Sequence, residues 1–208
     1  MKRKEFISKE LLRIGAVNIR PKNPYTWTSG LKSPIYCDNR LTMSFPEVRN
    51  QIVTDLVDII ETHYPQAEVI AGTATAGIPH AAWVAERLNL PMIYIRSEAK
   101  KHGTGKQIEG TFNTGAKIVV IEDLISTGQS VIDAVNVAKG EGADVLGVAA
   151  IFTYELPLGK SAFTDLTIDY HTVTDYSSLI KAALASGHIE QEDLAALEKW
   201  KDSPENWS

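Results

Sequence analysis

Short apolar runs alternate with segments of helical spacing from residue 67 onward. The segments at residues 78–88 and 129–139 repeat their apolar positions with the period of a helix. The apolar runs are predicted strands, at residues 68–72, 92–95, 117–121 and 145–152. Such alternation is typical of βαβ units, and parallel strands that are buried on both faces have this continuous apolar character. The pattern predicts an α/β fold with a mostly parallel central sheet flanked by helices.

Less regular segments lie on either side of this alternation. Before it, we predict helices over residues 5–17 and 46–63, separated by loops and short strands over residues 19–44. After it, we predict an edge strand over 166–170, helices over 175–186 and 190–200, and a polar end that frays. We expect one domain, residues 1–208, with an N-terminal segment (1–45), an α/β core (46–172) and C-terminal helices (173–208).

Composition narrows the class of protein. The chain has 208 residues, 44% of them apolar, which suits one α/β domain with a full core. Its net charge of −5 argues against a general nucleic-acid binder. Cys37 is the single cysteine, so neither an intrachain disulfide nor a cysteine-based zinc site is possible. We read no signal peptide and no apolar run of membrane-spanning length, and therefore expect a cytoplasmic protein without membrane partners.

The sharpest local feature is the run KIVVIEDLISTGQSV at residues 117–131. An apolar strand leads into Glu122 and Asp123, and Ser126-Thr127-Gly128 then precedes a helix. A glycine allows successive backbone amides to face one anion, and the helix N-terminus and the hydroxyl groups add to this attraction. Ser-Thr-Gly alone is more simply explained as a helix-capping turn. The whole run of strand, acidic pair, loop and helix favours a phosphate monoester site.

The acidic pair needs a different ligand, because carboxylates repel phosphate. Ribose hydroxyl groups are donors and suit Glu122 and Asp123, as does a divalent cation carried by a diphosphate. A structural alternative is that such an aspartate only caps a neighbouring helix.

A basic loop, RSEAKKHGTGK at residues 96–106, follows the predicted strand at 92–95. It carries five positively ionisable side chains among eleven residues. A solvated surface loop is the simpler interpretation. However, the loop leaves the same sheet edge as the acidic pair, because parallel strands end together, and ligands bind at that edge. It therefore suits a mobile lid that closes over a pyrophosphate leaving group.

These segments resemble known enzymes. VVIEDLISTGQS resembles the signature of type I phosphoribosyltransferases, which bind 5-phosphoribosyl 1-pyrophosphate (PRPP). RSEAKKHGTG resembles the catalytic loop of orotate phosphoribosyltransferases, and TSGLKSPIYCDNR, at residues 28–40, resembles their base-covering segment. GTATAGIP, at residues 72–79, resembles their pyrophosphate loop. The resemblance implies the type I phosphoribosyltransferase fold, with a small N-terminal hood over the base site and a PRPP-binding core.

The resemblance also implies roles for individual residues. Lys100, His102 and Asp123 are the expected catalytic residues, and Ser126 is expected to contact orotate. The expected PRPP ligands are Arg96, Lys100, His102, Glu122, Asp123, Leu124, Ile125, Ser126, Thr127, Gly128, Gln129 and Ser130. No side chain is assigned to a metal, because Mg²⁺ is expected to bind mainly through PRPP and pyrophosphate. The chain departs from the family at Thr28, Ala76 and Ser97, where relatives can carry cations.

The implied reaction transfers the 5-phosphoribosyl group from PRPP to orotate, giving orotidine 5′-monophosphate and pyrophosphate in pyrimidine biosynthesis. The resemblance further implies a homodimer in which lid residues are shared across the interface. Two alternatives stay open from the sequence: a phosphoribosyltransferase for a purine base, and a nucleotide-sensing regulator of the same fold that has lost catalysis.

Overall fold

The computed structural model describes residues 3–27, 30–98 and 106–207. A six-stranded sheet runs through its centre, in the order β10-β9-β8-β5-β6-β7. Its strands are β5 (Val69–Thr73), β6 (Met92–Ile95), β7 (Ile108–Glu109), β8 (Lys117–Ile125), β9 (Asp144–Thr153) and β10 (Tyr170–Asp175). All neighbours pair in parallel except β6 and β7, which are antiparallel. The predicted α/β fold with a mostly parallel sheet is confirmed.

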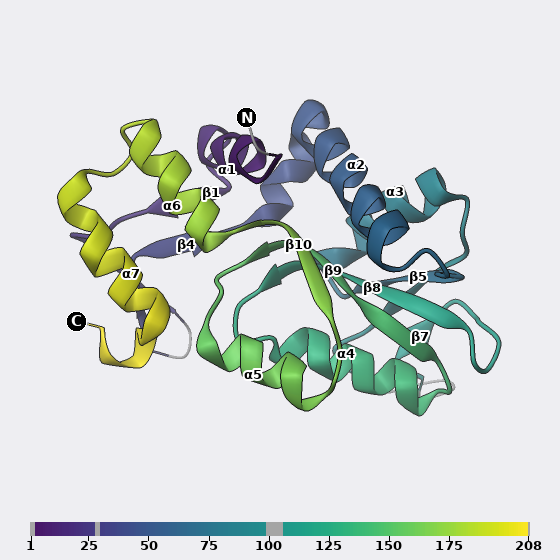
Figure 1. The fold of residues 1–208 in the computed structure, drawn as a ribbon. Coiled ribbons are helices and arrows are strands. Elements are labelled where there is room, and N and C mark those ends of the chain that lie inside the picture. Colours follow the sequence, from purple (N-terminus) through teal and green to yellow (C-terminus); the bar gives the residue numbers. More distant parts are fainter. Residues whose placement is uncertain (1–2, 28–29, 99–105, 208) are drawn as a thin grey trace.

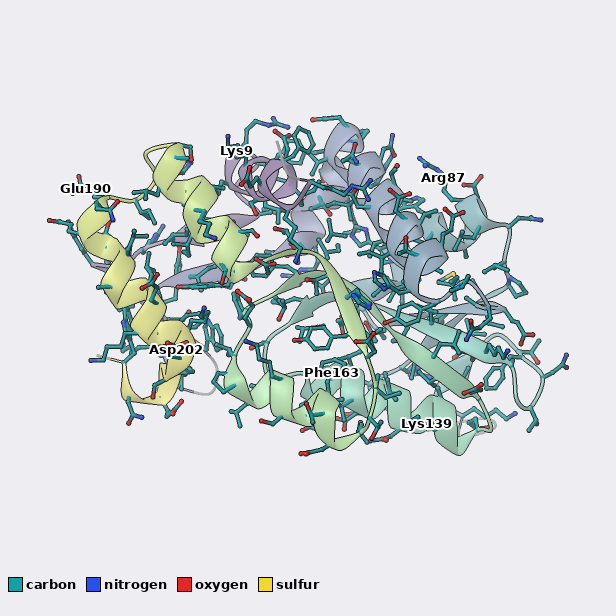
Figure 2. All side chains as sticks on the ribbon, in the orientation of Figure 1. Lys9, Arg87, Lys139, Phe163, Glu190 and Asp202 are labelled. Carbon is teal, nitrogen blue, oxygen red and sulfur yellow. The ribbon has the colours of Figure 1, made fainter. Side chains whose placement is uncertain are left out.

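Helices cover both faces of this sheet (Figure 1). One face carries α1 (Arg3–Arg13), α2 (Pro46–His63) and α3 (Gly77–Leu88), and the other carries α4 (Gln129–Gly140) and α5 (Pro157–Asp165). Each face has its own cluster of buried apolar side chains, because continuous apolar strands such as β8 present side chains to both sides. Figure 2 shows side chains filling both layers, with Phe163 of α5 beneath the sheet.

The N-terminal segment forms small antiparallel pairs away from the main sheet. The strand β1 (Val17–Ile19) pairs with β4 (Ile35–Cys37), and β2 (Tyr25–Thr26) pairs with β3 (Lys32–Ser33). A 3₁₀ helix, η1 (Asn39–Ser44), then leads into α2. The C-terminal part comprises α6 (Tyr176–Ala185), η2 (Gln191–Asp193), α7 (Leu194–Asp202) and η3 (Pro204–Asn206).

An aromatic cluster joins these two ends of the chain. The ring of Trp27 lies 5.4 Å from that of Tyr154 and 5.8 Å from that of Trp200, measured between centroids. The indole nitrogen of Trp200 donates a hydrogen bond to the carbonyl of Lys32 at 3.1 Å. The C-terminal helices therefore support the β2–β3 hairpin. No helix in the described parts of the chain is long and apolar enough to cross a membrane.

Three details of the sequence prediction were wrong. The edge strand does not lie at residues 166–170 but at β10. The helix α5 before it was not predicted, although Pro157 in its first turn was a usable signal for the start of a helix. The strand β8 does not stop at residue 121 but continues to Ile125, with Glu122, Leu124 and Ile125 paired to β9. The C-terminal end does not fray, because the indole of Trp207 is buried and donates to the carbonyl of Ala196.

Gly77 offers a stability test, because α3 approaches β8 very closely there. A Cβ atom at Gly77 would lie 2.5 Å from the carbonyl oxygen of Ile121 and 2.5 Å from the hydroxyl of Thr73. We expect Gly77→Ala to lower the free energy of unfolding by about 1–3 kcal/mol. Thermal and denaturant unfolding would measure this change. Gly140→Ala is the matched control, since nothing lies within 4 Å of its added Cβ. Equal unfolding midpoints for the two variants would contradict the close approach.

Candidate active site

The parallel strands bring the sequence-predicted loops to one edge of the sheet. Thr73 ends β5, Arg96 follows β6, and Glu122 and Asp123 lie near the end of β8. Because β5 pairs with both β6 and β8, these three positions are neighbours across the sheet. The structure thus brings together segments that are up to 50 residues apart in sequence.

Glu122 is the most deeply placed of the predicted site residues. Its side chain is 6% exposed, and its Oε1 lies 2.8 Å from the hydroxyl of Thr73, which donates to it. The backbone amide of Asp123 donates to the same oxygen at 2.9 Å. Burial, and then the neighbouring carboxyl of Asp123, raise the pKa of Glu122 well above its ordinary value. This carboxyl therefore favours a proton, or a ligand that brings hydrogen-bond donors.

Asp123 is partly buried beside it and faces the N-terminal segment. Burial raises the pKa of Asp123, whereas the positive charge of Arg40 acts in the opposite direction. The side-chain amide of Asn39 donates to the backbone carbonyl of Asp123 at 2.7 Å. Asn39 is fully buried, and its Oδ1 lies 3.4 Å from the sulfur of Cys37. The end of β8 is thus tied to the start of η1.

The predicted phosphate loop, residues 126–130, turns from β8 into α4. Gly128 caps the helix with φ +82°, a conformation that favours glycine. The helix α5 packs beneath the loop, since a Cβ at Gly159 would lie 2.8 Å from the carbonyl oxygen of Ser126. Thr127, Gln129 and Ser130 are exposed, and Ser126 is half-buried. Hydroxyl groups and the N-terminus of α4 are therefore presented at one surface.

Two predicted PRPP ligands, Leu124 and Ile125, contribute little through their side chains. The Ile125 side chain belongs to the buried cluster on the α4 side, and its carbonyl accepts a hydrogen bond from the amide of Tyr154 at 3.0 Å. Leu124 is half-buried against the opposite cluster. These residues keep only main-chain groups for a ligand.

The basic loop is described only at its two ends. The amide of Arg96 donates to the carbonyl of Gln107 at 2.9 Å, and the guanidinium of Arg96 lies 3.7 Å from Glu109. A cavity of about 130 Å³ lies between these ends and α4, lined by residues that include Thr73, Arg96, Ser97, Gln107 and Ser130. Lys100 and His102, like Thr28, lie outside the described residues.

The loop after β5 is the third sequence-predicted segment at this edge of the sheet. Its small residues, Ala74 to Ala76, connect Thr73 to α3, and the Ala74–Thr75 peptide bond is cis. The close approach at Gly77 sets this loop directly beside β8. Small side chains leave the backbone accessible to a ligand.

Sequence reasoning missed Thr73 as the partner of Glu122. Its position at the end of a core strand was a usable signal, but the pairing depends on the register of β5 and β8. The bond from Asn39 to Asp123, across 84 residues, had no sequence signal.

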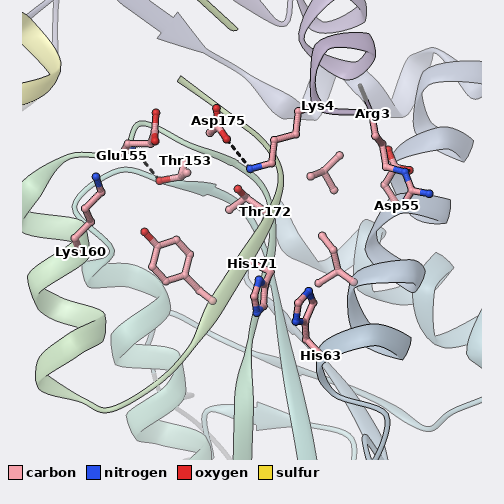
Figure 3. Close-up of a pocket in the computed structure, with 13 residues that line it drawn as sticks. Arg3, Lys4, Asp55, His63, Thr153, Glu155, Lys160, His171, Thr172 and Asp175 are labelled. Carbon is pink, nitrogen blue, oxygen red and sulfur yellow. Dashed lines mark hydrogen bonds and ion pairs between the residues drawn. The ribbon is translucent and has the colours of Figure 1, made fainter. Parts of the chain in front are cut away.

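A larger cavity, of about 480 Å³, lies along the outer strand β10 and contains none of the predicted site residues (Figure 3). Each of its acidic side chains has at least one partner, although Oδ2 of Asp55 has no hydrogen-bond partner among the described residues. Asp175 pairs with Lys4 at 2.7 Å, and Asp55 pairs with Arg3 at 3.1 Å. Glu155 accepts from the amide of Ser177 at 2.8 Å. The candidate active site is therefore the edge formed by β5, β6 and β8.

Comparisons with known proteins agree with this geometry. Residues 49–177 match the phosphoribosyl transferase domain family. The chain is 60% identical to an orotate phosphoribosyltransferase from Enterococcus faecalis over 97% of this chain and 96% of that protein. It is 56% identical to an orotate phosphoribosyltransferase from Bacillus caldolyticus over 98% of both chains.

Solved structures show the same fold. The crystal structure of an orotate phosphoribosyltransferase from Aeropyrum pernix aligns with a TM-score of 0.75 and 26% identity. That alignment covers 88% of this chain and 99% of the other. An orotate phosphoribosyltransferase from Mycobacterium tuberculosis, in complex with PRPP, shares the fold at a TM-score of 0.64 and 21% identity, covering 85% and 98% of the two chains.

The raised pKa of Glu122 predicts a pH dependence of stability. The folded protein binds this proton more tightly than the unfolded chain, so the free energy of unfolding falls as the pH rises above about 5. Glu122→Gln keeps the shape and removes the titration, so we expect its stability to fall less over the same range. Denaturant unfolding from pH 5 to pH 8 would measure the difference. Glu141→Gln, at an exposed position, should follow the wild type. Parallel curves for wild type and Glu122→Gln would contradict the assignment.

Proposed function

The chain belongs to the orotate phosphoribosyltransferase family, and we propose that it transfers the 5-phosphoribosyl group of PRPP to orotate, forming orotidine 5′-monophosphate and releasing pyrophosphate. One observation supports the assignment to this site: the buried Glu122 and the partly buried Asp123 lie directly before a glycine-bent loop at a helix N-terminus. That arrangement supports binding a ribose and its 5-phosphate side by side. We also propose that the reaction is a cytoplasmic step of pyrimidine biosynthesis.

The acidic pair would hold the ribose. The hydroxyl groups of PRPP are donors, and the buried Glu122 and the partly buried Asp123 offer carboxyl oxygens to them. Residues 126–130 would hold the 5-phosphate through main-chain amides and the hydroxyl groups of Thr127 and Ser130. The half-buried Ser126, between the two subsites, would contact orotate. Residues 1–45 would form the hood over the base.

The remaining ligands would serve the pyrophosphate. Arg96, Lys100 and His102 would supply positive charge as the bond between ribose C1 and the pyrophosphate oxygen breaks and the electron pair leaves with the oxygen. Deprotonated N1 of orotate would form the new bond to C1 from the opposite face, through an oxocarbenium-like state. No covalent enzyme intermediate is needed, so the protein acts by positioning and electrostatics.

The residues of this site are compatible with Mg²⁺ that enters bound to PRPP. The described residues contain no group of three or more His, Cys, Asp or Glu side chains that could hold a metal ion. The diphosphate would supply most of its ligands, with the acidic pair nearby, and the bound ion would offset negative charge on the leaving group.

An assay of purified protein tests the function directly. We expect loss of orotate absorbance when the protein is incubated with PRPP, Mg²⁺ and orotate, with formation of one pyrophosphate for each orotate consumed. Parallel reactions with adenine, guanine and hypoxanthine are the controls. Turnover of a purine alone would identify a purine-base enzyme. Absence of product with every base would instead support a nucleotide-sensing regulator.

We further propose a homodimer in which the lid of one subunit closes over the site of its neighbour. Complementation tests this arrangement. Lys100→Ala removes a lid cation and Asp123→Asn alters the ribose site, so each variant should be inactive. In randomly mixed dimers, half of the molecules are heterodimers, and each would contain one site with neither change. We therefore expect about a quarter of wild-type activity. Mixed dimers, verified by mass spectrometry, that recover no activity would show that each lid serves its own subunit.

A further inference from the structure

Binding an anionic base at this site presents an electrostatic problem, given the proposed function. Orotate carries a carboxylate, and the site already contains the carboxyl group of Asp123, with that of Asp38 one residue away from Asn39, which is bonded to Asp123. Like charges repel each other, and the repulsion is strongest where water is excluded. A cation near the base would offset this repulsion. Relatives can carry cations at the positions of Thr28, Ala76 and Ser97, where this chain has none.

The carboxylate of Asp38 fixes the orientation of the Arg40 guanidinium. Its Nε donates to Oδ1 of Asp38 at 2.7 Å, and its Nη2 donates to Oδ2 at 2.8 Å. This two-point bond fixes the plane of the guanidinium. It lowers the pKa of Asp38 and raises that of Arg40, so both groups stay charged. The remaining N–H groups on Nη1 and Nη2 can serve a second acceptor.

Asn39 connects the Asp38–Arg40 pair to the strand β8. It is fully buried between Asp38 and Arg40, and its amide holds the backbone carbonyl of Asp123 at 2.7 Å. The amide of Asp38 also donates to the carbonyl of Ala16 at 2.7 Å. The turn at residues 38–40 is thus bonded to the N-terminal segment on one side and to β8 on the other.

The guanidinium nevertheless remains open to solvent and to ligands. The Arg40 side chain is 60% exposed. Arg40 directly follows Asn39, which is bonded to Asp123, and its positive charge acts against the rise in the pKa of Asp123 that burial causes. If the acidic pair binds the ribose, as proposed above, Arg40 adjoins that subsite from the side of the expected hood over the base.

We propose that Arg40 binds the carboxylate of orotate and thereby selects orotate over bases that lack this group. Asp38 orients the guanidinium, and Asn39 sets its place relative to Asp123. This proposal rests on the proposed function and adds a specificity residue to it.

Comparing two nucleotides isolates the carboxylate. Orotidine 5′-monophosphate and uridine 5′-monophosphate share the phosphate, the ribose and the ring, and only the first carries the carboxylate. Dissociation constants of both would be measured by calorimetry for the wild type and Arg40→Gln. We expect the wild type to prefer orotidine 5′-monophosphate, and the variant to lose about 10–100-fold of that preference, the scale of one charge-assisted hydrogen bond. Affinity for uridine 5′-monophosphate should not change.

Two further variants complete the test. Arg40→Lys keeps the charge without the two-point geometry and should restore part of the preference. Arg13→Gln is the matched control, because Arg13 is 52% exposed and is also bonded through Nε and Nη2 to a carboxylate, that of Glu10, away from the site. It should bind both nucleotides as the wild type does.

Other outcomes would overturn the proposal. If Arg40→Gln lost the same affinity for both nucleotides, Arg40 would contact the ribose or the phosphate and not the carboxylate. If both dissociation constants were unchanged, Arg40 would not contact the bound nucleotide. Failure of the proposed function is distinguishable, because the wild type would then consume no orotate in the assay with PRPP and Mg²⁺, whichever nucleotide it bound.

Discussion

Two adjacent carboxyl groups stand near the end of the central strand β8, and burying them requires hydrogen-bond donors close by. An unpartnered charged carboxylate away from water costs several kcal/mol, about as much as the net stability of many domains. The structure meets this cost with Thr73 and the amide of Asp123 on Glu122. Asn39 occupies the carbonyl of Asp123. The donors to the Glu122 carboxyl come from β5 and β8, whereas Asn39 of η1 bonds the backbone of Asp123 and so ties the N-terminal segment to the sheet at the acidic pair.

The same constraint explains the close packing around the site. Gly77 lets α3 start against the carbonyl of Ile121, which keeps Thr73 in reach of Glu122. Gly159 lets α5 support the loop at Ser126 from below. A ligand would therefore meet surfaces that are already in place around the acidic pair. Such preorganisation is how a protein stabilises developing charge without rearranging during the reaction.

The N-terminal segment is bonded directly to the acidic end of β8. Its turn at residues 38–40 is bonded to Asp123 through Asn39, and it presents Arg40 beside the acidic pair. The aromatic contacts of Trp27 with Tyr154 and Trp200 support the hairpin from the other end of the chain. The surface of the expected base site thus depends on contacts between residues separated by more than 100 positions.

The sequence by itself determined the alternation of strands and helices and the run of acidic pair, loop and helix, because these depend on local periodicity and on neighbouring residues. It could locate the helices of the core to within a few residues and place Asp123 and Gly128 in one motif. It misplaced β10 and missed α5, since an edge strand and a short helix have weak apolar patterns. Only the tertiary structure decided that Thr73 and Asn39 hold the acidic pair and that Arg40 stands beside it. These contacts follow from strand register and from packing between distant segments, neither of which leaves a local trace in the chain.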